Sequence, residues 1–203
     1  MPQKHALENL RNRRIKIATI NDLNDPFDLL CISLPSKQLR KWISDSRNEI
    51  ARKFGMLCFC AGWNNPLLWS HYADRHRGLC FGFDIHATKL KAIRYVDHRL
   101  PPKVPPTSQD VQDLLFTKFK DWSYEREYRG WFRLDECDPN TRLYFYSFDD
   151  SLHLRQIIVG PLCDVTRGQL EDATEGMKKP IEFVKARLAF QSFTVTRQQR
   201  GLL

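Results

Sequence analysis

The stretch that decides the fold runs from Trp63 to Ile85 and reads WNNPLLWSHYADRHRGLCFGFDI. Asn65 is a favourable helix N-cap and Pro66 suits the first helical position. Gly78 suits the residue that closes a helix, because glycine adopts the left-handed conformation without steric cost. The pattern therefore predicts a short helix, followed by an apolar strand at 79–85.

A second apolar run, FGMLCFC at 54–60, precedes this helix and predicts another strand. The local unit is thus expected to be strand, short helix, strand. Helical spacing of apolar residues predicts further helices at 4–13, 36–53, 110–121 and 166–176. Further strands are predicted at 14–20, 92–96, 122–133, 142–148 and 153–160, with a strand pair or one bulged strand at 181–196.

These elements predict an α+β protein, with a mixed, mainly antiparallel twisted sheet and four to five helices. The length of 203 residues and the hydrophobic content of 42% favour a single domain over residues 1–203. Four prolines at 97–110 predict a surface loop within it.

Composition narrows the function classes. Aromatic residues make up 12% of the chain, which excludes a disordered protein. The net charge of +8 lies mainly at the two ends of the sequence, and it favours an anionic ligand or nucleic acid. A solvated surface with surplus lysine and arginine gives the same pattern. No signal peptide or apolar run of membrane length is visible, so we expect a cytoplasmic protein without a membrane partner.

The loop at 21–28, NDLNDPFD, is dense in residues that bond their own backbone. It is expected either to shape a pocket or to form a rigid turn whose Phe27 fills the core. Its three aspartates do not match a calcium loop. The six cysteines lack zinc-site spacing and are expected to be reduced thiols. The helix at 36–53 has an apolar stripe, to which we assign core packing and no chemistry.

The segment 122–133, WSYEREYRGWFR, carries the most concentrated charge beside aromatic residues. If it is one strand, Glu125, Glu127 and Arg129 share a face. Two interpretations stay open for them: a ligand-binding group, or a ladder of ion pairs.

Two other catalytic patterns fit poorly. Ser70, His71 and Asp74 do not make a convincing triad, because adjacent residues of a helix do not face each other. His71 and His76 are five residues apart and do not share a helical face, so no metal is expected. The sequence also lacks a P-loop and a dinucleotide-binding glycine motif.

Several motifs in order carry a family resemblance: LNDPFD at 23–28, CFC at 58–60, LLWSHYADRHRGLCFGFD at 67–84, WSYEREYR at 122–129 and IIVG at 157–160. Together they resemble the bacterial domain-of-unknown-function family 2971 over residues 7–160. Members of that family usually have Phe where this chain has Leu23. They also have a further strand with an aromatic-basic motif ahead of the first helix, which residues 1–4 do not provide.

The order of elements is more distantly similar to the ADP-ribosyltransferase fold, in which a sheet cleft holds NAD. That resemblance implies that Glu127 is the catalytic carboxylate and Glu125 the second glutamate of the pair. It implies that Tyr72, with Ser70 beside it, packs against the nicotinamide, and that His71 and Arg129 touch substrate oxygens.

Cleavage of an N-glycosidic bond develops positive charge on the sugar, which a fixed carboxylate stabilises. The resemblance therefore implies an NAD-cleaving enzyme of a defence or toxin system, with nucleic acid or protein as the acceptor. The first-strand His or Arg of that superfamily has no counterpart here. A non-catalytic module that binds nucleic acid or a nucleotide, or an inactive truncated copy, therefore stays open as the alternative. The apolar stripe that contains Trp69 and Tyr72 favours core packing over ligand contact for both residues.

Overall fold

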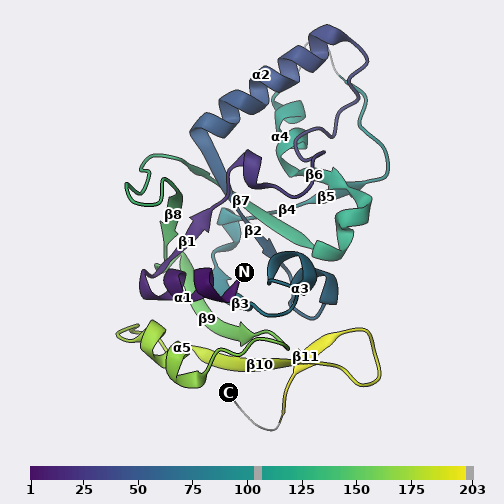
Figure 1. Cartoon of the computed structure of the whole chain (residues 1–203). Helices are drawn as coiled ribbons and strands as arrows, with labels where there is room; N and C mark the ends of the chain where they lie inside the picture. Colours follow the sequence, from purple (N-terminus) through teal and green to yellow (C-terminus); the bar gives the residue numbers. More distant parts are fainter. Residues whose placement is uncertain (103–106, 200–203) are drawn as a thin grey trace. The chain divides into compact units, whose positions relative to one another are not determined.

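The computed structural model describes residues 1–102 and 107–199. This part of the chain forms five α-helices, three 3-10 helices and eleven strands. Figure 1 labels the α-helices and the strands along the chain. Strand pairing is mixed but mostly antiparallel, so the predicted α+β class is confirmed. No helix in the described ranges is long and apolar enough to cross a bilayer.

The chain divides into two units. Unit 1 comprises Met1–Ile15, Gly62–His86 and Tyr146–Leu203, and unit 2 comprises Lys16–Ala61 and Ala87–Phe145. Two of the four unit boundaries fall inside strands, β1 (Arg14–Ile17) and β8 (Tyr144–Ser147). The single domain over 1–203 stays a prediction.

Unit 1 is built around one four-stranded sheet. Its elements in chain order are α1 (Gln3–Arg11), α3 (Pro66–Tyr72), β3 (Leu79–Ile85), β9 (Leu152–Val159), α5 (Arg167–Thr174), β10 (Glu182–Leu188) and β11 (Val195–Arg197). The strand order is β11-β10-β9-β3. Strand β9 runs parallel to β10, and a parallel pair needs a crossover connection, which contains α5.

Alternation along β9 places helices on both faces of this sheet. Ile157 belongs to a core cluster with Leu10 of α1 and Leu170 of α5. Its neighbour Ile158 belongs instead to a cluster with Trp69 of α3. Helices α1 and α5 therefore cover one face and α3 the other.

The start of α3 follows the prediction. The Asn65 side chain accepts a hydrogen bond from the Leu67 backbone N–H at 2.9 Å. The end does not: the helix stops at Tyr72, because residues 74–76 adopt left-handed conformations with φ of 46°, 52° and 71°. Gly78 is therefore not the left-handed residue that closes the helix.

Gly78 serves a different purpose. A side chain at this position would collide with the backbone carbonyl of Met1. Because glycine leaves this space free, the Leu79 N–H donates to the Met1 carbonyl at 2.9 Å, and the Met1 amino group donates to the Leu79 carbonyl at 2.7 Å. This exchange ties the start of the chain to β3.

Unit 2 contains the sheet β2-β7-β4 and the parallel pair β5-β6. Its elements in chain order are η1 (Ile20–Asp22), α2 (Lys37–Lys53), β2 (Phe54–Cys60), η2 (Ala87–Lys89), β4 (Lys91–Ala92), β5 (Arg94–Val96), α4 (Ser108–Phe116), β6 (Thr117–Phe119), η3 (Lys120–Glu125) and β7 (Glu127–Arg133). The expected local order of strand, short helix and strand is confirmed by β2, α3 and β3, but β2 and β3 lie in different sheets.

Three predicted boundaries in unit 2 also change. The helix predicted at 110–121 ends at Phe116, and β6 follows it. The strand predicted at 122–133 begins only at Glu127, because η3 occupies the residues before it and Arg126 is left-handed, with φ of 46°. Residues 103–106 of the predicted proline-rich loop lie outside the described residues, and α4 takes its last part, from Ser108.

Candidate functional site

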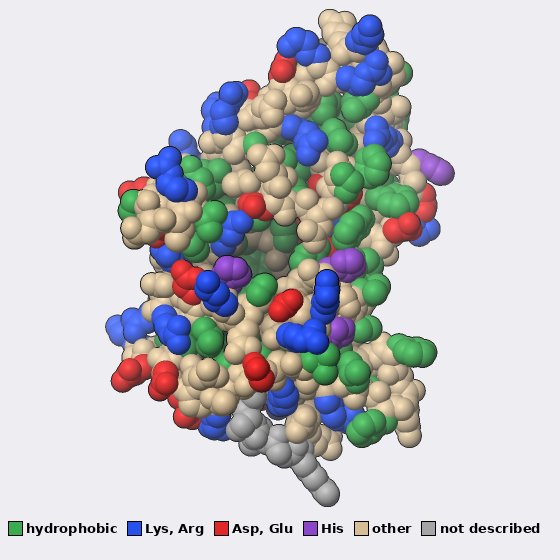
Figure 2. All heavy atoms as spheres, viewed as in Figure 1, with side chains coloured by type: hydrophobic (Ala, Val, Ile, Leu, Met, Phe, Trp, Pro, Cys, Tyr) green, Lys and Arg blue, Asp and Glu red, His purple; other side chains and the backbone are tan. Residues whose placement is uncertain are grey.

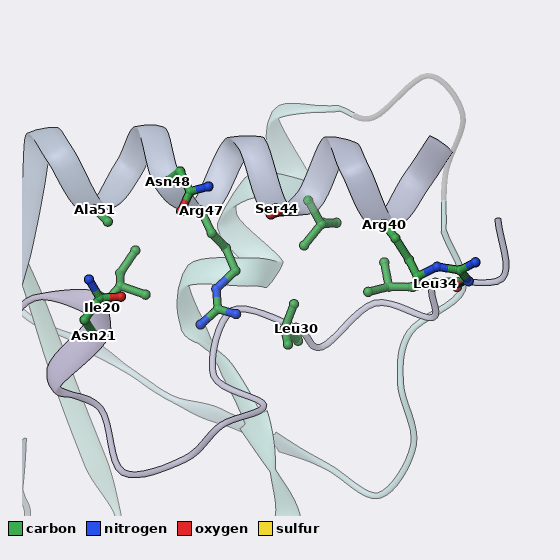
Figure 3. A pocket seen from close by; sticks show the side chains of 10 residues that line it. Ile20, Asn21, Leu30, Leu34, Arg40, Ser44, Arg47, Asn48 and Ala51 are labelled. Atoms are coloured by element: carbon green, nitrogen blue, oxygen red, sulfur yellow. Dashed lines mark hydrogen bonds between the residues drawn. The ribbon is translucent and has the colours of Figure 1, made fainter. Parts of the chain in front are cut away.

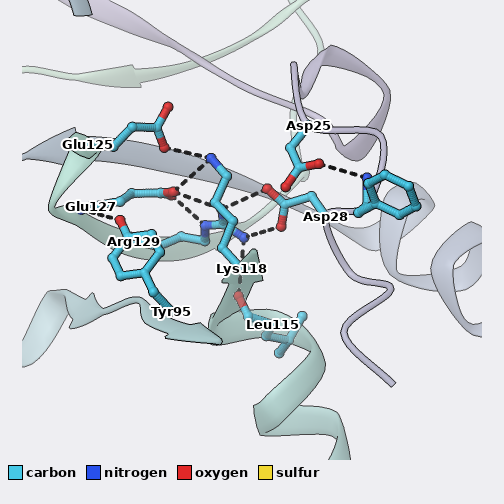
Figure 4. A network of polar contacts seen from close by, with 9 residues as sticks. Asp25, Asp28, Tyr95, Leu115, Lys118, Glu125, Glu127 and Arg129 are labelled. Carbon is cyan, nitrogen blue, oxygen red and sulfur yellow. Dashed lines mark hydrogen bonds and ion pairs between the residues drawn. The ribbon is translucent and has the colours of Figure 1, made fainter. Parts of the chain in front are cut away.

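Five charged side chains converge in the interior of unit 2 (Figure 4). Strand β7 supplies Glu127 and Arg129, which point to one face because they are two residues apart. Strand β6 supplies Lys118, the end of η3 supplies Glu125, and the loop at 21–28 supplies Asp28. All five are between 1% and 6% exposed. We call these residues the buried charge cluster.

The Arg129 guanidinium lies at the centre of the buried charge cluster. Its Nη1 and Nη2 donate to the two Asp28 carboxylate oxygens at 2.9 and 3.0 Å. Nε and Nη2 donate to the two Glu127 oxygens at 2.7 and 3.1 Å, and Nη1 also donates to the Leu115 carbonyl at 3.2 Å. An arginine side chain has five N–H donors, so every one of them has an acceptor.

Lys118 holds the two glutamates from the other side. Its Nζ lies 2.6 Å from Glu125 Oε2 and 3.5 Å from Glu127 Oε2. Burial by itself raises the pKa of Glu127, but Arg129 and Lys118 outweigh it and hold that pKa below its usual range. Burial lowers the pKa of Lys118, yet Glu127 and Glu125 raise it overall. Glu127 and Lys118 are therefore both charged at neutral pH.

Asp25 lies beside this cluster, and one of its oxygens is not satisfied. Oδ1 accepts from the Phe27 backbone N–H at 2.9 Å, whereas Oδ2 is buried and has no hydrogen-bond partner among the described residues. Burial, together with the neighbouring Asp28, raises the pKa of Asp25. With Asp25 there are four carboxylates against two cations, an imbalance that a proton on Asp25 reduces.

The loop at 21–28 thus lies against the cluster through its aspartates. Phe27 does not fill the core as one interpretation expected, because it is 55% exposed. Its ring lies under the guanidinium of Arg99, at 5.3 Å. The loop contributes carboxylates to the interior and an aromatic ring to the surface.

The structure brings only part of the predicted site together. Glu125, Glu127 and Arg129 meet in unit 2, although Glu125 comes from η3 and not from the same strand. Ser70, His71 and Tyr72 belong to α3 of unit 1 and are all exposed. The predicted residues are therefore described in two separate units.

On α3, the hydroxyl of Ser70 lies 3.1 Å from Nε2 of His76. The rings of His71 and Tyr72 are tilted against each other, with centroids 6.1 Å apart. Tyr72 is 41% exposed, so the expectation that it is a core aromatic is wrong, whereas Trp69 is 2% exposed and is confirmed as one. No group of three or more potential ligand residues in the described ranges can hold a metal ion.

Sequence reasoning missed two members of the buried charge cluster. Lys118 was considered only as part of the helix predicted at 110–121, and Asp28 only as part of a loop. Each has a local signal, because Lys118 lies between Thr117 and Phe119 and Asp28 precedes the apolar run LLCI at 29–32. A charge within an apolar run is costly to bury unless it is paired.

Comparison with known proteins gives no further guide. No family model, no curated protein and no solved structure matches this chain. The resemblances to family 2971 and to the ADP-ribosyltransferase fold therefore stay predictions, and the functional argument rests on the geometry of the two units.

Proposed function

We propose that the chain binds a nucleotide or a related phosphate-bearing anion without cleaving it. The observation that carries this proposal is that both candidate catalytic carboxylates are already paired with buried cations of the chain. Glu127 is held by Arg129 and Lys118, and Glu125 is held by Lys118, all in the interior of unit 2. These contacts support a structural role for the two glutamates.

The chemistry of NAD cleavage explains why this matters. A carboxylate that stabilises a sugar cation must face the position where positive charge develops. Both oxygens of Glu127 accept hydrogen bonds from Arg129 instead. Loss of one partner from a buried ion pair of this kind costs about 3–5 kcal/mol, whereas a hydrogen bond from a substrate hydroxyl to a carboxylate returns only about 1.5–3 kcal/mol.

The charge of the molecule supports an anionic ligand of limited size. The net charge is +8. Figure 2 shows lysine and arginine side chains spread over the visible face, with acidic and apolar side chains among them. A protein that follows a nucleic-acid backbone usually gathers its basic side chains along one face or helix. The mixed pattern on this face favours a compact anion over a long nucleic acid.

NAD cleavage in a defence or toxin context, with nucleic acid or protein as the acceptor, is the second candidate. Asp25 is the observation that favours it, because its Oδ2 is a buried acceptor to which no donor in residues 1–102 or 107–199 bonds, and it lies beside groups with perturbed pKa values. An oxygen of this kind would accept a hydrogen bond from a sugar hydroxyl.

One experiment separates the two candidates. The purified chain is incubated with NAD, with and without cellular RNA and DNA, and nicotinamide release is measured. Binding of AMP, ADP and NAD is followed by calorimetry at two salt concentrations. We expect saturable, salt-sensitive nucleotide binding and no nicotinamide above the blank.

Two variants provide the control. Glu127→Gln removes the candidate catalytic charge, and Glu136→Gln removes an exposed charge of the same unit. Nicotinamide release that Glu127→Gln abolishes and Glu136→Gln retains, at a temperature where both remain folded, would show that the chain is an NAD-cleaving enzyme.

A further inference from the structure

A pocket in unit 2 lies along α2, apart from the residues predicted to be catalytic or to bind NAD. It has a volume of about 330 Å³. The residues that line it come from η1 and the residues before α2 on one side and from α2 on the other: Ile20, Asn21, Leu30, Leu34, Arg40, Ile43, Ser44, Arg47, Asn48 and Ala51. Figure 3 shows that the side chain of Arg47 extends from the helix into this space. We call it the α2 pocket.

Arg47 is one of two arginines that line the α2 pocket. Its Nε is buried, and no acceptor in the described part of the chain bonds to it. The acidic residues on either side of it in the sequence are engaged elsewhere, since Asp45 pairs with Lys41 at 2.7 Å and Glu49 pairs with Lys53 at 2.7 Å. A guanidinium N–H that is removed from water without an acceptor is unfavourable, and an anion in the pocket would satisfy it.

The second arginine of the pocket has a different role. Nη1 of Arg40 donates to the backbone carbonyls of Leu34 and Pro35, at 2.9 and 3.3 Å. Arg40 therefore fixes the segment that forms one wall. Its positive charge still lies at the pocket and adds to the attraction for an anion.

The remaining lining residues set the shape and polarity of a ligand. Asn21, Ser44 and Asn48 are exposed residues whose side chains carry hydrogen-bond donors. The other wall residues are aliphatic: Ile20, Leu30, Leu34, Ile43 and Ala51. Half of the ten lining residues are polar, a larger share than is usual for a small-molecule site, which suits a charged ligand. The volume lies at the lower end of the range of such sites, about 300–1,000 Å³.

We propose that the α2 pocket binds a compact organic anion, whose phosphate or carboxylate group pairs with Arg47 while its apolar body lies against the aliphatic wall. This inference rests on the proposed function of a binding module and assigns that function a site. Both possible charged groups match the forked geometry of arginine donors.

The test measures the affinity of four probes by calorimetry: AMP, adenosine, inorganic phosphate and benzoate. Adenosine lacks the charge of AMP, inorganic phosphate lacks the apolar body, and benzoate replaces phosphate by carboxylate. We expect AMP or benzoate to bind at least about 10-fold more tightly than adenosine or inorganic phosphate, as the loss of a charged hydrogen bond predicts. Which of the two binds identifies the anionic group. Equal binding of adenosine and AMP would overturn the inference.

Three variants test whether the probe binds in the α2 pocket. Arg47→Gln removes the charge, Ser44→Leu narrows the pocket from an exposed helical position, and Arg52→Gln removes an exposed charge of the same helix outside the pocket. We expect Arg47→Gln and Ser44→Leu to weaken the tighter-binding probe at least about 10-fold and Arg52→Gln to leave its affinity unchanged.

The outcomes separate this inference from the proposed function. Binding by the unmodified chain that survives both Arg47→Gln and Ser44→Leu would overturn the α2 pocket and leave the binding function intact. Absence of binding of every anionic probe by the unmodified chain would overturn the binding function itself. Melting curves confirm that each variant is folded, and Ser44→Leu decides the matter if Arg47→Gln does not fold.

Discussion

Glu127→Gln tests whether the buried charge cluster holds unit 2 together. The substitution keeps the size of the side chain but removes its charge, so Arg129 retains only Asp28 as a carboxylate partner. The new amide NH₂ would also lie close to N–H donors of Arg129 or to Lys118 Nζ, where a donor has no acceptor to meet. Glu127 itself is 5% exposed, so water does not compensate for this loss.

The expected size of the effect follows from the burial of all partners. Removing one member of a buried ion pair costs about 3–5 kcal/mol, a large share of a typical stability of about 5–15 kcal/mol. For a chain of this length, about 1 kcal/mol corresponds to about 2–4 °C in melting temperature, so we expect a decrease of about 6–20 °C.

The assay is thermal melting followed by circular dichroism, with Glu136→Gln as the matched control. Glu136 is exposed, so its substitution is expected to change the melting temperature by less than about 2 °C. If Glu127→Gln melts within about 2 °C of the unmodified chain, the reasoning from burial and ion pairing is refuted. Such a result would also mean that Glu127 is not needed for stability and is available as a catalytic group.

Three further predictions concern other parts of the chain. Burial raises the pKa of Asp25, so the stability linked to its proton is present at acid pH and is lost as the pH rises through that raised pKa. Asp25→Asn should therefore melt above the unmodified chain at about pH 8 and close to it at about pH 4.5, and a constant difference would contradict this. Phe190 and Phe193 are 89% and 99% exposed, so replacing both by Ser should leave the melting temperature unchanged and reduce aggregation measured by light scattering; a large loss of stability would show that they are packed. Gly78→Ala should cost about 1–3 kcal/mol in chemical denaturation, because its Cβ meets the Met1 carbonyl, and an unchanged midpoint would contradict that contact.

Local signals in the sequence predicted the elements whose stabilising contacts are short in range. Asn65 begins α3 as expected, and Thr166 begins α5 through a capping box with Gln169. The segment 181–196 forms the expected strand pair, β10 and β11. These contacts join residues a few positions apart, so the sequence alone contains both partners at a readable spacing.

Element ends were less predictable, because they depend on contacts with distant segments. Strand β6 takes over where the predicted helix would continue, since Thr117 and Lys118 pair with β5 and are buried. The pairing gives these two residues hydrogen-bonding partners and a place in the interior that a further helical turn would not. The secondary-structure propensities of the residues at 110–121 do not show that pairing with β5 is favoured over a further helical turn.

The α2 pocket is another feature that the sequence alone did not predict. The apolar stripe of α2 was interpreted as core packing, and Ile43 is indeed buried. Arg40 and Arg47 are seven residues apart and so lie on one face of the same helix, near that stripe. Two cations beside an apolar stripe are visible in the sequence, but the wall opposite them, with Leu30 and Leu34, comes from a segment without regular structure.

The sequence by itself determined the α+β class, the starts of α3 and α5 and the common face of Glu127 and Arg129, because each follows from periodicity or from a cap within one segment. Only the tertiary structure decided what those charges do. Asp28 meets Arg129 across 101 positions of the chain, and Lys118 reaches Glu125 and Glu127 from a strand that was expected to be helix. A charge pattern gives the sign and spacing of groups, whereas their burial and their partners depend on long-range packing, which here engages the predicted catalytic pair in the interior.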